Sequence, residues 1–147
     1  MASGLGAIAE TIQLSVTPVF LLVATGSLLN VFTGRLARVI DRARVLEGLH
    51  PRSHGPEHDR HVWELRLLDR RIVIINRALY LAVFSAVMTC SVVALLFIAE
   101  LAGLRIGQFV ATAFVLSMVL LIAALISFLV EVRMSLRAVE VREELLR

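Results

Sequence analysis

The sequence predicts an all-α membrane protein with three transmembrane helices. Its residues are 59% apolar and its mean hydropathy is +0.86, whereas soluble domains are roughly 45–50% apolar. The excess lies in three uncharged runs, at about 11–34, 78–99 and 106–130. Each run has the roughly 20 residues with which a helix crosses a bilayer core of about 30 Å. Because helices satisfy their own backbone groups in lipid, we expect three helices in one membrane domain, residues 1–147.

The arginines predict how the chain is oriented in the membrane. All 15 basic residues are arginine, and 14 of them lie either between the first two runs or after the third. Only Arg105 lies in the opposite connection, between the second and third runs. Cytoplasmic segments of membrane proteins carry the excess of positive charge. We therefore expect a cytoplasmic connection at about 35–77, a cytoplasmic C-terminus and an N-terminus outside.

The long connection has the pattern of a helical hairpin. Apolar residues recur at roughly helical spacing after the first run, so the first span is expected to continue into the cytoplasm as one helix. Gly48 and Pro51 are typical of its end, and residues 50–56 are typical of a turn. A second helix is expected to begin near Glu57 and to run on into the second span. The tail, at about 131–147, also has helical spacing among its Glu and Arg residues, and we expect it to pack on the hairpin.

The first span is unusually polar for a helix that lies in lipid. Alternating steps of three and four residues from Glu10 keep a set of residues on one side of a helix. This set, the heptad face, comprises Glu10, Gln13, Thr17, Phe20, Ala24, Ser27, Val31, Gly34, Arg38 and Asp41. Polar and small side chains dominate the heptad face, and Phe20 and Val31 are its bulky apolar members.

Two interpretations of the heptad face remain open. In a ring of subunits it would line a pore, with Glu10 and Gln13 at an outer mouth that selects cations and with Phe20 or Val31 as apolar constrictions. The inner exit would be surrounded by the basic residues Arg35, Arg38 and Arg42. This order of groups is similar to that in the pore helix of store-operated calcium channels, in the opposite chain direction and without a sequence match. Alternatively, membrane helices use small and polar residues to pack against one another.

The segment from Ser27 to Arg44 carries a family resemblance. Its sequence, SLLNVFTGRLARVIDRAR, resembles the signature of a bacterial membrane-protein family catalogued as domain of unknown function 2721 (DUF2721). The upstream PVFLL, from Pro18 to Leu22, fits the same family. The resemblance covers most of the chain and implies a multi-pass protein of the bacterial inner membrane with three spans. The family's name records no activity, so the functional hypotheses have to come from the residues.

The sequence shows none of the familiar catalytic or cofactor-binding patterns. It has no nucleophile elbow, no P-loop and no zinc-ligand spacing, so we expect no enzyme, no cofactor and no nucleic-acid partner. A solvated turn is favoured over a metal site for the four histidines, which are His50, His54, His58 and His61. A secondary transporter is disfavoured, because no inverted repeat is visible and no charge lies inside any of the three runs.

Two functional hypotheses follow. The first is a homo-oligomeric ion channel that conducts cations, either calcium or monovalent ions, through a pore lined by the first span. The second is a non-conducting scaffold or regulatory module that binds partners or anionic lipid through its cytoplasmic helices. Arg35, Arg38 and Arg42 fit either hypothesis, because arginines at a membrane surface also orient the chain and bind anionic headgroups, at about 1 kcal/mol per residue.

Overall fold

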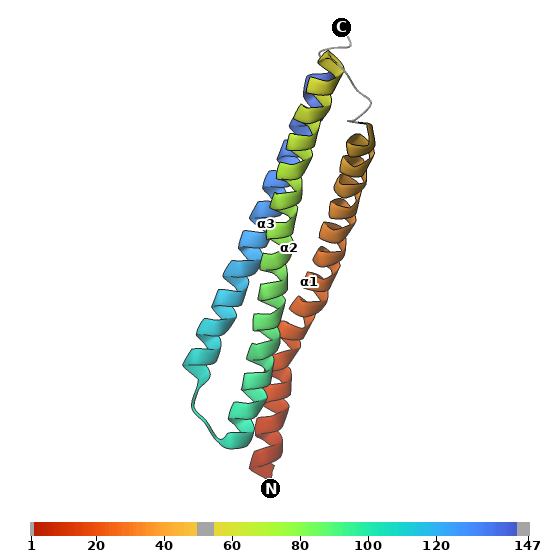
Figure 1. Cartoon of the computed structure of the whole chain (residues 1–147). Coiled ribbons are helices and arrows are strands. Elements are labelled where there is room, and N and C mark those ends of the chain that lie inside the picture. The colour runs from red at the N-terminus through yellow and green to blue at the C-terminus, as the bar shows by residue number, and fades with distance from the viewer. Residues whose placement is uncertain (1, 50–54, 144–147) are drawn as a thin grey trace. The chain divides into compact units, whose positions relative to one another are not determined.

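The computed structural model of the chain describes residues 2–49 and 55–143. These residues form three helices, α1 (Ala2–Leu49), α2 (Pro56–Ala102) and α3 (Gly107–Glu143), which Figure 1 shows in order along the chain. The predicted all-α fold class is confirmed for this part of the chain.

Each helix contains a segment that is long and apolar enough to cross a membrane. The segments are Ser15–Gly48, His58–Ala102 and Gly107–Leu136. They are 34, 45 and 30 residues long, which exceeds the roughly 20 residues that a spanning helix needs. The three helices are therefore long and apolar enough to cross a membrane, as expected for a multi-pass membrane protein.

The helices do not end where the uncharged runs end. α1 continues past Gly34 to Leu49 and contains Pro18 without interruption. α2 begins at Pro56, one residue before the expected start, and a proline is well placed there because the first helical residue needs no hydrogen-bond donor. α3 runs through the third span into the predicted tail as one helix. Residues 50–54 of the expected turn and residues 144–147 of the tail lie outside the described residues.

The turn between α2 and α3 shows how the second helix ends. Gly103 has a φ of +62°, a conformation that costs glycine little because it lacks a Cβ atom. The amide of Leu104 donates to the carbonyl of Ala99 at 2.9 Å, and the amide of Gly103 donates to that of Glu100 at 3.4 Å. These two bonds form a Schellman cap, which satisfies carbonyl groups at the helix end.

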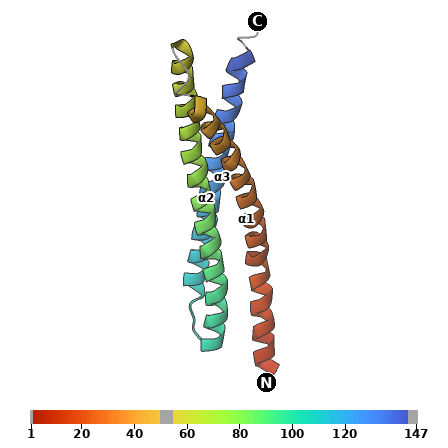
Figure 2. The same ribbon diagram turned by 45° about the vertical axis from the view of Figure 1, so that its right-hand side comes forward.

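The chain divides into two compact units, and every helix contributes to both. The first unit comprises Met1–Leu29 with Leu81–Ala123, and the second comprises Asn30–Tyr80 with Ala124–Arg147. Both sets of segments can be followed by residue number along the ribbons in Figures 1 and 2.

Small polar residues make up much of the core of the first unit. Ser15, Thr25, Ser85, Thr89 and Ser117 are all buried there. The Ser85 hydroxyl on α2 donates to the backbone carbonyl of Ser117 on α3 at 2.7 Å, and the Thr89 hydroxyl lies 3.3 Å from the Ser117 hydroxyl. Small residues let membrane helices approach closely, and hydroxyls then join them. This contact is therefore a polar seam between α2 and α3.

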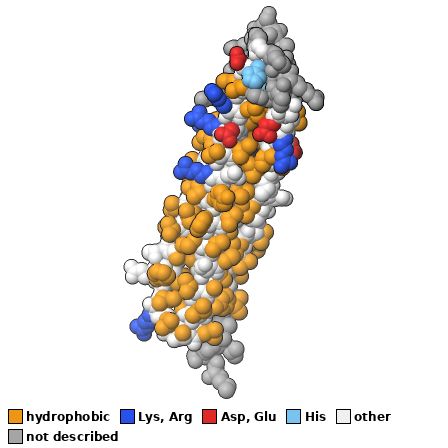
Figure 3. All heavy atoms as spheres, in the orientation of Figure 1, with side chains coloured by type: hydrophobic (Ala, Val, Ile, Leu, Met, Phe, Trp, Pro, Cys, Tyr) orange, Lys and Arg blue, Asp and Glu red, His pale blue; other side chains and the backbone are white. Residues whose placement is uncertain are grey.

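The core of the second unit is aliphatic, and the charged side chain of Glu131 lies within it. Val39 and Leu46 on α1 and Leu68 and Ile75 on α2 form a buried cluster. Each pair is seven residues apart, which is the spacing that keeps a seam facing a neighbouring helix in a coiled coil. Charged side chains of this unit gather toward the end where α1 ends and α2 begins (Figure 3). Unlike these charged side chains at the surface, Glu131 on α3 has a fully buried side chain.

Candidate functional site

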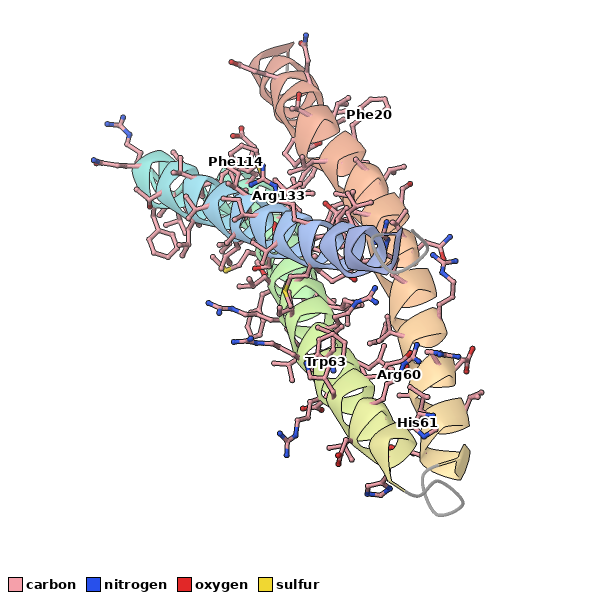
Figure 4. The ribbon with its side chains drawn as sticks, turned by 90° about the horizontal axis from the view of Figure 1, so that it is seen from above. Phe20, Arg60, His61, Trp63, Phe114 and Arg133 are labelled. Atoms are coloured by element: carbon pink, nitrogen blue, oxygen red, sulfur yellow. The ribbon has the colours of Figure 1, made fainter. Side chains whose placement is uncertain are left out.

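The structure leaves the heptad face of α1 uncovered by the other helices. Its members from Glu10 to Val31 are exposed, Gly34 is half-buried, and Arg38 and Asp41 are again exposed. Phe20, with 72% of its surface exposed, points outward from α1 in Figure 4. Apart from the half-buried Gly34, the predicted pore-lining residues are therefore exposed and are not buried against α2 or α3.

The buried side of α1 begins one residue further along the chain. Pro18, Thr25, Phe32, Val39 and Leu46 are buried, and each follows the last by seven residues. One residue corresponds to about 100° around a helix, so this row of buried residues and the heptad face point in different directions. Both rows have heptad spacing, which is why periodicity alone could not say which row packs inside the chain.

The polar groups of α1 are satisfied in part by the helix itself. The Ser27 hydroxyl donates to the carbonyl of Val23 at 3.3 Å, and the Thr33 hydroxyl donates to that of Asn30 at 3.0 Å. The side chains of Gln13 and Asn30 are exposed. A side-chain amide carries two donor hydrogens and an acceptor oxygen, so these residues present polar groups on the outside of α1.

The three arginines of the predicted inner basic region, Arg35, Arg38 and Arg42, have different surroundings. Arg38 is exposed on α1. Arg42 donates two hydrogen bonds to Glu64 on α2, at 3.1 and 2.8 Å, on the surface of the second unit. Arg35 instead turns toward Glu131 on α3, at 3.2 Å. Two of the three arginines thus form ion pairs with glutamates on other helices.

Glu131 is a charged side chain that is fully buried. Its Oε1 atom accepts hydrogen bonds from Arg71 Nε at 3.1 Å, from Arg71 Nη2 at 2.8 Å and from the Ser135 hydroxyl at 2.8 Å. Its Oε2 atom accepts a hydrogen bond from Arg35 Nη1 at 3.2 Å. One buried carboxylate therefore joins α1, α2 and α3. We call Arg35, Arg71 and Glu131 the three-helix cluster.

Aromatic rings complete the surroundings of Arg35. The guanidinium carbon lies 5.3 Å from the centroid of the Phe128 ring, and that ring lies 4.5 Å from the ring of Phe32. A guanidinium over an aromatic face gains a further attraction of about 0.5–2 kcal/mol. Arg35 is therefore held by a carboxylate and a ring at the same time.

The three-helix cluster carries a net positive charge, and its two arginine side chains are partly exposed. Two guanidinium groups face a single carboxylate, and arginine stays charged in proteins. The Arg35 side chain is 33% exposed and that of Arg71 is 20% exposed, whereas Glu131 is 0% exposed. The carboxylate is thus enclosed, and the guanidinium groups reach the surface.

The sequence puts Glu131 at the start of the predicted tail and does not by itself predict that its side chain is buried. The structure shows it buried, and it lies inside the candidate span Gly107–Leu136. One signal was present in the sequence, because Glu131 follows the buried residues Val110, Ser117 and Ala124 at seven-residue steps. A heptad count along α3 would have placed its side chain on the inner side.

Of the four histidines, those that the structure describes do not form a metal site. His50 and His54 lie outside the described residues. The Nδ1 atom of His61 is buried without a hydrogen-bond partner. Among residues 2–49 and 55–143, no three His, Cys, Asp or Glu side chains come together in a way that could hold a metal ion.

Comparison with known proteins places the chain in a family. Residues 15–141 match the family described as "Protein of unknown function (DUF2721)". Neither a curated protein nor a solved structure matches the chain.

Proposed function

This chain belongs to the DUF2721 family, whose description names no activity, and we propose its function from its own residues. It is a homo-oligomeric ion channel of the bacterial inner membrane that conducts cations, either calcium or monovalent ions. α1 lines the pore with its heptad face. The single observation that carries this proposal is that α2 and α3 leave the heptad face uncovered.

The chemistry of the uncovered face favours water over lipid. Gln13 and Thr17 are exposed on α1, beside and within the candidate span. A polar group without a partner in hydrocarbon costs several kcal/mol. A ring of subunits removes this cost, because neighbouring copies cover the flanks of α1 and the pore hydrates its polar row.

The order of residues along the heptad face suits a cation pathway. The excess of arginine in the connection after α1 puts Glu10 at the outer end of the helix. A ring of Glu10 carboxylates, with Gln13 beside it, concentrates cations at the mouth. Rings of Phe20 and Val31 form apolar constrictions that close by dewetting, and Arg38 lies beyond them at the inner end.

Ion flux from liposomes that contain the purified protein tests the proposal. We expect cation flux in the wild type and a lower ratio of cation to anion permeability in Glu10→Gln. Glu47→Gln is the matched control, because Glu47 is also an exposed glutamate of α1 but lies off the heptad face. Unchanged selectivity in Glu10→Gln would remove Glu10 from the mechanism, and an absence of flux in the wild type would contradict the channel.

Cysteine accessibility separates the channel from a non-conducting scaffold. Single cysteines would be placed in a Cys90→Ser background at Gln13, Thr17, Ala24 and Ser27. Water-soluble thiol reagents should reach these positions in a channel, and should not reach a cysteine at Val19, which is exposed on α1 but off the heptad face. Protection of all four positions would favour the scaffold. A monomeric or dimeric mass in detergent would also exclude a central pore with one α1 helix per subunit.

A further inference from the structure

We propose that the three-helix cluster binds the phosphate group of an anionic phospholipid such as phosphatidylglycerol. The inference goes beyond conduction, because it concerns α1, α2 and α3 in the second unit and requires no pore. It rests on the position of the cluster, on its excess of positive charge and on the way Arg35 is held.

The cluster lies where the apolar runs end. Arg35 is the first charged residue after the uncharged run of α1, and Glu131 is the first after the uncharged run of α3. Lipid headgroups begin where the hydrocarbon core ends, a little beyond the last apolar turns of a spanning helix. Arg71 lies seven residues before the uncharged run of α2, and its guanidinium is held at the same level by its 2.8 Å hydrogen bond to Glu131. The two guanidinium groups are therefore at the level of the phosphate groups.

The guanidinium groups have donors to spare. A guanidinium carries five N–H donors. Arg35 uses one donor on Glu131 and Arg71 uses two. Because 33% of its side chain is exposed, Arg35 can hold the carboxylate with one donor and offer its remaining donors to a second anion. Guanidinium and phosphate groups fit each other through paired hydrogen bonds.

Glu131 and Phe128 distinguish this site from a diffuse row of surface charge. Both hold the Arg35 guanidinium in one position, at 3.2 Å from the carboxylate and 5.3 Å from the ring centroid. A side chain that is already ordered loses less entropy when it binds a ligand. Arg38, one turn further along α1, is exposed and lacks these two supports. The structure therefore predicts unequal roles for two neighbouring arginines.

Apolar surface beside the cluster favours a lipid over a free anion. Leu129 and Val130, just before Glu131 on α3, are apolar side chains that are 50% and 46% exposed. An acyl chain would cover these side chains while the phosphate lies on Arg35. Inorganic phosphate would meet the same guanidinium groups but would gain nothing from the apolar flanks.

Lipid retention by the full-length protein tests the site. The protein in neutral detergent would be mixed with equal amounts of phosphatidylglycerol and phosphatidylcholine, and bound lipid would be counted by native mass spectrometry. We expect the wild type to retain phosphatidylglycerol preferentially. Arg35→Gln should lower that preference about 10-fold, which corresponds to ~1.4 kcal/mol. Arg38→Gln removes the same charge from the same helix and should lower it less than about 2-fold, because a neutral micelle has no anionic surface for Arg38 to sense.

Three results would overturn the site. Equal retention of the two lipids by the wild type would exclude it. An equal loss in Arg35→Gln and Arg38→Gln would show that diffuse charge, not the cluster, attracts the lipid. Displacement of phosphatidylglycerol by millimolar inorganic phosphate would show that the ligand is a free anion.

A second measurement does not depend on the folding of a variant. A phosphatidylglycerol analogue with a photoreactive acyl chain would be cross-linked to the wild-type protein, and its adducts would be mapped by mass spectrometry. Adducts should concentrate within about two helical turns of Arg35 and Glu131. An even spread of adducts over the three spans would contradict the proposal.

Discussion

Replacing Glu131 with glutamine keeps the shape of the side chain but removes the charge that Arg35 and Arg71 share. Removal of one partner of a buried ion pair typically costs about 3–5 kcal/mol, because the remaining charge is left buried and unpaired. Here Arg35 and Arg71 are 33% and 20% exposed, so each can recover some hydration. The glutamine oxygen also still accepts a hydrogen bond. We therefore expect Glu131→Gln to lower the free energy of unfolding by about 2 kcal/mol, below that range.

The chain contains a matched control for this substitution. Glu64 accepts hydrogen bonds from Arg42 Nε and Nη2 at 3.1 and 2.8 Å, the same two distances at which Glu131 accepts from Arg71. The two pairs differ in burial, because the Arg42 and Glu64 side chains are 50% and 30% exposed. Exposed ion pairs contribute about 0–1 kcal/mol. Glu64→Gln should therefore change stability by less than about 1 kcal/mol.

Unfolding in mixed micelles of neutral detergent and sodium dodecyl sulfate measures both variants. The loss of helical circular dichroism would be followed as the fraction of dodecyl sulfate rises. Equal losses in Glu131→Gln and Glu64→Gln would refute the reasoning that burial decides the value of the pair. A Glu131→Gln variant as stable as the wild type would show that the carboxylate does not hold the helices together.

Three further predictions use the same unfolding assay. Arg71→Gln should lower stability more than Arg35→Gln, because Arg71 donates two hydrogen bonds to Glu131 and Arg35 donates one, and hydrogen bonds to charged groups contribute about 1.5–3 kcal/mol each. The reverse order would contradict this arrangement of the bonds. Ser85→Leu should destabilise by about 1–3 kcal/mol, since Ser85 is buried against α3, and an unchanged transition would place α2 and α3 further apart than the structure has them. Gly103→Ala should cost about 1–2 kcal/mol because of its positive φ, whereas Gly107→Ala should be nearly neutral, and equal effects would argue against the Schellman cap.

The helices follow from local properties of the sequence. An uncharged run of more than 20 residues has to be helical in lipid, whatever its neighbours are. Glycine and proline near residues 48–56 are typical of helix ends, and the structure ends α1 at Leu49 and starts α2 at Pro56. These features depend on each residue's own neighbours in the chain, which is why the sequence predicted them closely.

The packing of the second unit does not follow from local properties. Two rows of α1 have heptad spacing, and only one of them, through Phe32 and Val39, meets the other helices. Glu131 looked like the first residue of a charged tail, and only the positions of Arg35 and Arg71 on two other helices make its burial tolerable. A residue's environment in such a bundle depends on partners that are 60 and 96 residues away in the chain.

By itself, the sequence determined the all-α class, the three spans, the family resemblance and the polar character of α1. Each of these depends on composition or on spacing along one helix. Only the tertiary structure decided that the heptad face is the outer side of α1, and that a carboxylate at the end of the third uncharged run joins all three helices. The physical reason is that burial is a relation between helices: the sequence shows which residues share a side of a helix, and only packing shows which side is covered.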